Sequence, residues 1–187
     1  ARIVCSDGTE YHVPQRLQVL ERRQRRAQRK LSRCDRGSNR RQVAKMRVAK
    51  VYRTVRRVRE NWLHEITTDL VRKNTRIVIE DLSVRGMTAS ARGTVDKPGK
   101  NVRAKAGLNR AILRAGFGEF RRQLTYKGQW YGTEIIVADR WFASSKTCSG
   151  CGIKNESLTL ADRIFRCGAC GLVIDRDLNA AINLRNW

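Results

Sequence analysis

The sequence lacks the features that would place the protein in a membrane or outside the cell. It contains no run of eighteen apolar residues, the length that a membrane-spanning helix needs, and no secretory segment. Acidic residues are scarce too, because 17 Asp and Glu face 40 Lys and Arg for a formal net charge of +23. The excess positive charges repel one another unless an anionic partner is bound. We therefore expect nucleic acid as a partner and do not expect a membrane as one. A ribosomal or chromatin-like structural protein stays open at this charge.

The chain also lacks an initiator methionine. Its first residues, Ala1–Cys5, read as a strand, and the Asp7-Gly8 pair that follows suits a hairpin turn. No earlier strand is available to pair with this one. We therefore expect the chain to be the later part of a larger protein.

Two CxxC pairs lie near the C-terminus, Cys148 with Cys151 and Cys167 with Cys170, and fifteen residues separate them. This is the spacing of a four-thiolate zinc ribbon, in which each pair comes from one tight turn and a short hairpin joins the turns. The alternative is a pair of disulfides, which the missing secretory segment disfavours. The two cysteines outside these pairs, at positions 5 and 34, are expected to be free thiols.

Two acidic residues, Asp175 and Asp177, follow the second CxxC pair and precede a helical segment over residues 179–184. Alone, they would be ordinary residues of a helix N-terminus, where acids cap the backbone and complement the helix dipole. Their place directly behind a zinc ribbon favours a functional role instead.

Residues 15–73 predict a hairpin of two helices that carries most of the net charge. An apolar stripe at helical spacing marks the second helix as packed on a core, and Trp62 belongs to that stripe. Residues 16–60 hold 18 Lys and Arg against three acids, a net charge of +15. Like charges at neighbouring helical positions repel, so this concentration of positive charge would be unfavourable on a face that only contacts water. We expect the hairpin to bind phosphates of DNA or RNA. The candidate contacts are Arg22, Arg23, Arg25, Arg26, Arg29, Lys30, Arg40 and Arg41.

The segments after the hairpin alternate between strand and helix. Residues 77–79 predict a strand buried on both faces, and Glu80 stands at its C-terminal end, where open α/β sheets place their sites. The alternative for Glu80 is a solvated strand end paired with an arginine. Residues 85–107 predict a basic loop, residues 108–130 predict helical material broken at Gly116, and residues 133–138 predict a second strand. This order predicts one α/β domain with a small zinc-bound insertion.

Several motifs together resemble the RuvC-like nuclease domain of the TnpB proteins, which are transposon-encoded relatives of the compact type V CRISPR effectors. They are IVIEDLSV from Ile77, LTYK from Leu124, WYG from Trp130, SSKTCSGCG from Ser144, CGACG from Cys167 and DRDLNAA from Asp175. The resemblance implies an RNase H-like mixed sheet with flanking helices and an inserted zinc ribbon with four cysteine ligands. The implied divisions are a nuclease core over residues 1–145, a ribbon over residues 146–172 and a final helical segment over residues 173–187.

The resemblance also implies an activity, which is cleavage of DNA selected by a bound guide RNA. Three carboxylates would hold two Mg²⁺ ions, with Glu80 as the second carboxylate and Asp177 as the third. Asp175 is the second choice for that third position. The first carboxylate belongs on a strand before Ala1, so we expect the 187 residues alone not to cut DNA. The implied location is the cytoplasm of a bacterium or archaeon, in association with the nucleoid.

Two other functions stay open. One is a nuclease-dead protein that still binds DNA under the direction of a guide RNA. The other is an accessory DNA-binding protein of a transposable element, in which the ribbon and the basic hairpin bind DNA without a guide. Dependence of DNA binding on a guide separates this last function from the others.

Overall fold

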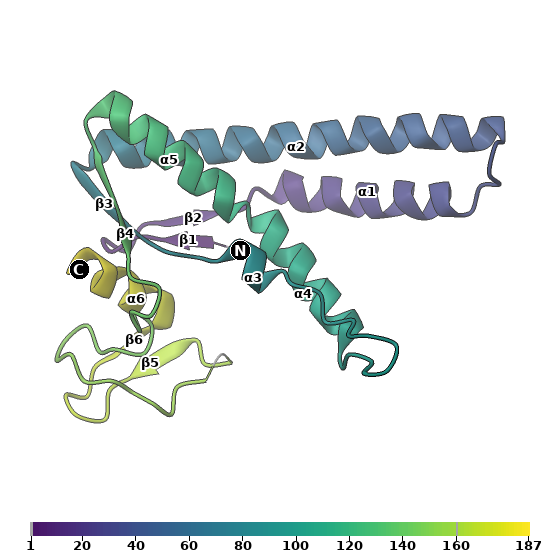
Figure 1. The fold of residues 1–187 in the computed structure, drawn as a ribbon. Helices are drawn as coiled ribbons and strands as arrows, with labels where there is room; N and C mark the ends of the chain where they lie inside the picture. The colour runs from purple at the N-terminus through teal and green to yellow at the C-terminus, as the bar shows by residue number, and fades with distance from the viewer. Residues whose placement is uncertain (1, 160) are drawn as a thin grey trace. The chain divides into compact units, whose positions relative to one another are not determined.

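The structure is a computed structural model that describes residues 2–159 and 161–187, so Ala1 of the expected first strand and Leu160 of the expected ribbon lie outside it (Figure 1). It contains two compact units. One consists mainly of Tyr11–Ile66, and the other of Ile3–Glu10 together with Thr67–Trp187. Within the described residues, no helix has the length and apolar character needed to cross a membrane.

The first unit is a helical hairpin, as predicted. Its first helix, α1, covers Gln15–Ser32, and the much longer α2 covers Asn39–Lys73 and continues into the second unit. Leu17 and Leu20, one helical turn apart on α1, pack with Val55 of α2 to form the hairpin core. Trp62 is buried with 8% of its surface exposed, which confirms its place on the apolar stripe.

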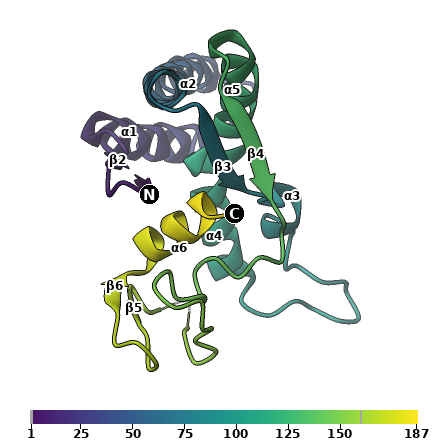
Figure 2. The same cartoon turned by 90° about the vertical axis from the view of Figure 1, so that its left-hand side faces the viewer.

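The second unit contains a parallel pair of strands, β3 (Arg76–Glu80) and β4 (Glu134–Ala138), shown side by side in Figure 2. Because parallel strands need a long crossover, the helices α3 (Val84–Met87), α4 (Val102–Ala115) and α5 (Phe117–Tyr131) lie between them in the chain. The register places Glu80 opposite Ala138 at the C-terminal ends of both strands. Gly116 separates α4 from α5 with a φ of 73°, as its position in the sequence predicted.

Two features differ from the expectation. In the part of the chain that is described, the strands form three two-stranded sheets, where a larger mixed sheet was predicted: β1 (Arg2–Val4) with β2 (Glu10–His12), β3 with β4, and β5 (Ile164–Arg166) with β6 (Val173–Asp175). The middle residues of β3 are therefore half-buried, where burial on both faces was predicted.

The basic loop is also shorter than the predicted range 85–107, because it runs only from α3 to α4. Gly86 and Gly107, which signalled a loop in the sequence, lie inside these two helices. The hydroxyl of Ser83 accepts a hydrogen bond from the N–H of Gly86 and caps α3. Local capping thus overrides the weak helix propensity of glycine at this position.

A buried polar network joins the end of α2 to α5. Lys127, with 5% of its surface exposed, donates from Nζ to the hydroxyls of Thr67 and Thr68, both at 2.7 Å. The Thr67 hydroxyl in turn donates to Oε1 of Gln123 at 3.0 Å. Burial lowers the pKa of Lys127. The network therefore satisfies buried polar groups that would be costly to leave without partners.

Replacing Lys127 by methionine should lower the free energy of unfolding by about 1–3 kcal/mol, because it keeps the length of the side chain and removes the donor to two buried hydroxyls. Urea denaturation of the purified chain measures the effect. Gln129→Ala, an exposed position on the same helix, is the matched control and should change stability by no more than about 0.5 kcal/mol. Equal stability of the Lys127→Met protein and the parent would show that the network contributes nothing.

Candidate functional site

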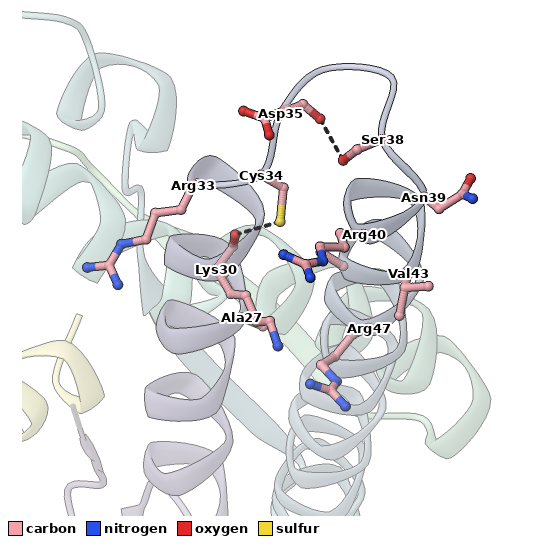
Figure 3. Close-up of a pocket in the computed structure, with 11 residues that line it drawn as sticks. Ala27, Lys30, Arg33, Cys34, Asp35, Ser38, Asn39, Arg40, Val43 and Arg47 are labelled. Atoms are coloured by element: carbon pink, nitrogen blue, oxygen red, sulfur yellow. Dashed lines mark hydrogen bonds between the residues drawn. The ribbon is translucent and has the colours of Figure 1, made fainter.

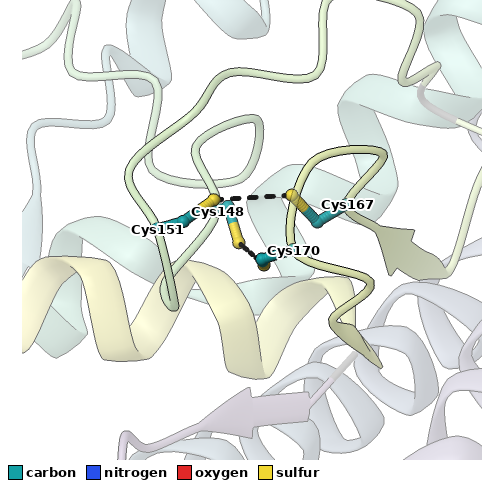
Figure 4. Close-up of side chains that lie close together, drawn as sticks. All are labelled: Cys148, Cys151, Cys167 and Cys170. Atoms are coloured by element: carbon teal, nitrogen blue, oxygen red, sulfur yellow. Dashed lines mark hydrogen bonds between the residues drawn. The ribbon is translucent and has the colours of Figure 1, made fainter.

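The four cysteines of the two CxxC pairs converge on one point (Figure 4). Their sulfur atoms all lie within 4.8 Å of one another, with 3.6 Å between Cys148 and Cys170 and 3.6 Å between Cys151 and Cys167. A disulfide needs about 2.05 Å. A tetrahedral zinc site with metal–sulfur bonds of about 2.3 Å separates its sulfurs by about 3.8 Å. The spacing therefore fits four ligands of one metal ion and does not fit disulfides.

Tight turns bring each pair together. The N–H of Gly152 donates to the carbonyl of Cys148 at 2.9 Å, and the N–H of Gly171 donates to the carbonyl of Cys167 at 3.1 Å. Both glycines have a positive φ, 76° and 74°, which a residue with a Cβ rarely adopts. Backbone N–H groups that point at the sulfur of Cys167 lower the pKa of this thiol to about 6, which favours the thiolate that a metal needs.

Glu80, the predicted second carboxylate of the site, lies at the C-terminal end of β3. Its Oε1 accepts a hydrogen bond of 2.8 Å from the hydroxyl of Ser144, a buried residue on the segment that leads from β4 to the ribbon. Within the described residues, no Lys or Arg forms an ion pair with Glu80. The alternative interpretation, a strand end neutralised by arginine, applies to its neighbour instead.

That neighbour, Asp81, forms ion pairs with Arg121 and Arg140. Hydrogen bonds from Arg140 and Arg121 lower the pKa of Asp81. Asp81 thus ties α5 and the end of β4 to the end of β3. Of the two adjacent acids, Asp81 forms these ion pairs, and Glu80 forms none with the residues that the structure describes.

The two aspartates at the start of α6 (Arg176–Arg185) also differ in their contacts. Oδ1 of Asp175 accepts hydrogen bonds from the N–H groups of Asp177 and Leu178, at 2.9 and 3.1 Å, and so caps the helix. Asp177 lies in the first turn, with its side chain 40% exposed and 3.8 Å from Arg176. The two aspartates differ, because Asp175 has the ordinary capping role that the sequence suggested for both.

Two asparagines on α6 hold the segment that leads into the ribbon, and sequence reasoning gave them no role. Asn179 accepts from the N–H of Ser149 at 2.9 Å and donates to the carbonyl of Thr147 at 2.7 Å. Asn183, one turn later, donates to the carbonyls of Ser144 and Thr147 at 2.8 and 2.7 Å. Both asparagines are buried, and the signal in the sequence was their spacing of four residues among apolar neighbours.

Among the residues that the structure describes, the carboxylates do not form a cluster of three. Within the described ranges, the four cysteines are the one group of three or more His, Cys, Asp or Glu residues whose ligand atoms meet. The structure does bring β3 and α6, which carry Glu80 and Asp177, into contact in one unit. The catalytic assignment of these two residues stays a prediction.

The basic hairpin has a hollow of about 620 Å³ near the loop between α1 and α2 (Figure 3). Two of the predicted phosphate contacts, Lys30 and Arg40, line it, and so does Arg47, which was not among them. Arg41 is half-buried, and its guanidinium donates to the carbonyls of Leu31 and Cys34 at the end of α1. Arg41 is thus a weaker candidate for a phosphate contact than the exposed arginines.

Comparisons with known proteins agree with these features. A family described as "Cas12f1-like, TNB domain" matches residues 117–184, and one described as "Probable transposase" (OrfB_IS605) matches residues 3–91. InsQ of Escherichia coli strain K12, named "Putative RNA-guided DNA endonuclease", is 39% identical over 179 residues, 96% of this chain and 44% of that protein. TnpB-like protein L79 of Acanthamoeba polyphaga mimivirus is 32% identical over 135 residues, 72% of this chain and 24% of that protein. The chain belongs to the TnpB family.

A further relative of this TnpB-family chain, from Streptomyces pristinaespiralis and named like the E. coli protein, is 44% identical over 182 residues, 97% of this chain and 41% of that protein. The chain thus spans less than half the length of these bacterial relatives. Among solved structures, that of the mini-RNA-guided endonuclease CRISPR-Cas_phi3 aligns with a TM-score of 0.48 and 16% identity over 82% of this chain and 23% of that chain. The matched ranges of the TnpB-family chain include Glu80, the four cysteines and Asp177.

Proposed function

We propose that the chain is the RuvC-like nuclease portion of an RNA-guided DNA endonuclease encoded by a transposable element. The observation that carries the proposal is the double role of α6. This helix bears Asp177, and its Asn183 binds the backbone of Ser144, whose hydroxyl binds Glu80. One helix therefore provides one predicted metal ligand and positions the residue that orients the other.

The chemistry of these groups suits metal-dependent hydrolysis of a phosphodiester. Carboxylate oxygens are the ligands that Mg²⁺ prefers, and a pair of Mg²⁺ ions activates water and stabilises the leaving oxygen. Glu80 and Asp177 would hold these ions together with a further carboxylate, which the family resemblance places on another strand of an RNase H-like sheet. Ser144 fixes the rotamer of Glu80, because its hydroxyl is buried and bonded to the carboxylate.

The ribbon and the hairpin complete the proposal. Residues 146–172 would hold one structural Zn²⁺ through the four cysteines, since the sulfur spacing fits a tetrahedral ion. The hairpin would bind the phosphates of the guide RNA or of the target DNA. The nuclease core would then comprise residues 1–145 with the final segment, residues 173–187.

Dependence on a guide tests the proposal against its alternatives. The protein made from its complete gene, with RNA transcribed from the same locus, should cut DNA that is complementary to that RNA and should need Mg²⁺. Guide-dependent binding without any cleavage would support the nuclease-dead protein. Equal binding with and without the RNA would support the accessory DNA-binding protein.

Changing four arginines of α1 to glutamine should flatten the salt dependence of nucleic-acid binding. Each phosphate contact that Lys or Arg neutralises contributes about 0.9 to the slope of log K against log salt on duplex DNA, so the four should remove up to about 3.6. The variant is Arg22→Gln, Arg23→Gln, Arg25→Gln and Arg26→Gln. Its binding is measured by fluorescence anisotropy between about 50 and 300 mM salt, a range that spans a Debye length of about 10 Å.

The control has the same net charge and places the changes in the second unit. It carries Arg92→Gln, Arg103→Gln, Arg110→Gln and Arg185→Gln, all at exposed positions. A smaller change in slope is expected for the control. If both variants lose the same slope, the binding depends on total charge and not on the hairpin.

A further inference from the structure

We propose that Trp141 is a stacking platform for an unpaired base of the DNA strand that is presented to Glu80. This inference rests on the proposed nuclease function and assigns a residue that contacts its substrate. Three observations lead to it: the exposure of the indole, the rigidity of the turn that carries it, and the place of that turn beside Glu80.

The indole of Trp141 is 86% exposed, more than any other aromatic side chain in the described ranges. The other exposed tryptophans have ring partners: Trp130 packs on Tyr126 at 4.7 Å between centroids, and Trp187 packs on Phe142 at 4.6 Å. Of the residues that the structure describes, none makes a ring contact with Trp141. Tryptophan is enriched at interfaces, because its large ring provides contact area and its N–H can still find a partner.

The turn around Trp141 is fixed on both sides. Oδ1 of Asp139 accepts from the N–H of Trp141 at 2.7 Å, which is an Asx turn, and the carbonyl of Asp139 accepts from the N–H of Phe142 at 3.1 Å. Arg140 is bound to Asp81. The neighbours of Trp141 are thus held in place while its own ring is presented to solvent. Because the backbone that carries the ring is already ordered, ligand binding at this turn does not have to order the loop.

The turn lies at the edge of the sheet that carries Glu80. Glu80 is opposite Ala138 in the parallel register, so Trp141 follows only three residues after the strand partner of Glu80. Ser144, three residues further, donates to the Glu80 carboxylate. Both ends of the segment from Ala138 to Ser144 therefore lie next to Glu80, and Trp141 is at the middle of this segment.

An exposed indole suits a nuclease whose target sequence is chosen by a guide RNA. Every base has a π-face, so stacking holds a single strand without reading its sequence. Hydrogen bonds to base edges would instead restrict the sequences that can be cut. Stacking next to the carboxylate would hold one nucleotide still while the neighbouring phosphate meets the metal site.

The test compares single-stranded DNA with and without bases. The probes are a fluorescent twelve-nucleotide oligo(dT) and an abasic strand of the same length, and binding is measured without added Mg²⁺. For the parent chain, removal of the bases should weaken binding. Trp141→Ala should weaken binding to oligo(dT) by about 5- to 150-fold, the size of one base-aromatic contact, and should leave binding to the abasic strand unchanged. Trp141→Phe should recover most of the loss.

Trp130→Ala is the matched control, because Trp130 is 75% exposed but packs on Tyr126. It should bind oligo(dT) like the parent. Equal binding by Trp141→Ala and the parent, or equal losses on both strands, would overturn the stacking role. Guided cleavage by the complete protein is scored separately. If the complete protein cuts DNA and Trp141→Ala does not change binding, the nuclease function stands and the stacking role is wrong. If Trp141→Ala loses base-dependent binding and the complete protein does not cut, Trp141 stacks on bases and the proposed nuclease function is wrong.

Discussion

Replacing Cys148 or Cys170 by serine is expected to abolish stoichiometric zinc and to unfold residues 146–172. The four sulfurs lie within 4.8 Å of one another, and removing one leaves a metal site with three thiolates. Structural zinc sites are closed and four-coordinate, so a site with three thiolates holds the ion far less tightly. Because the unfolded segment has no preformed site, the free energy of zinc binding is also free energy of folding.

The expected effect is large because the ribbon has little else to hold it together. Its core consists of Phe165 and two of the cysteines themselves, with Leu158, Leu172 and Ile174 at the edge. One buried phenylalanine contributes about 1.5–3 kcal/mol, whereas structural zinc contributes on the order of 10 kcal/mol in small domains. A segment of this size is therefore expected to need the metal in order to fold.

Zinc content and hydrogen exchange together measure this effect. The parent chain should carry one Zn²⁺, and the serine variants should carry none and should exchange amides of residues 146–172 rapidly. Cys34→Ser is the matched control, since Cys34 lies in the first unit, where its thiol donates to the carbonyl of Lys30. Full zinc content in Cys148→Ser would show that the four sulfurs do not form the site.

Loss of zinc should also disturb the position of the Glu80 carboxylate. Asn179 and Asn183 bind Ser149, Thr147 and Ser144. These three residues lie within the segment 144–149, which leads from the turn after β4 into the first cysteine pair. Ser144 holds Glu80. If the ribbon unfolds, the segment that positions Glu80 loses its anchor on one side. The ribbon is thus connected to the proposed active site through α6. This helix binds Thr147 and Ser149 of the ribbon, and it also binds Ser144, which contacts Glu80.

The sequence predicted those parts of the molecule that depend on short-range spacing. Four features depend only on residues close together in the chain, so the sequence shows them directly. They are the CxxC pairs, the helical hairpin, the break at Gly116 and the strand that ends at Glu80. The start of α3 was missed because capping by Ser83 overrides a glycine signal.

The division of roles among the acids could not be predicted from spacing. In the sequence, Glu80 and Asp81 are equivalent neighbours, and so are Asp175 and Asp177. Their roles depend on partners far away in the chain, since Arg121 and Arg140 reach Asp81 and Ser144 reaches Glu80. Only the fold brings these residues together. The asparagines of α6 were missed for the same reason, because their partners are carbonyls 32 to 39 residues away.

Replacing either Glu80 or Asp177 by alanine should abolish guided DNA cleavage in the protein made from its complete gene, while guided binding stays. Each substitution removes a proposed oxygen ligand of Mg²⁺, an ion that demands near-octahedral geometry and binds poorly to an incomplete site. Metal stabilisation of the developing charge amounts to several kcal/mol, so the rate should fall by at least about a hundredfold. Binding should persist because the basic hairpin is unchanged, and Zn²⁺ content should stay that of the parent.

Two matched variants separate loss of a ligand from loss of structure. Glu80→Gln keeps an oxygen that can accept from Ser144, so it preserves the hydrogen bond and removes the charge; it should lose cleavage as Glu80→Ala does. Asp175→Asn keeps a good helix cap, because asparagine and aspartate cap about equally well, and it should retain cleavage if Asp175 only caps α6. A cleavage assay under single-turnover conditions with the guide RNA measures all four variants. Cleavage that survives both Glu80→Ala and Asp177→Ala would remove these residues from the active site, and loss of cleavage in Asp175→Asn with cleavage intact in Asp177→Ala would move the metal ligand to Asp175.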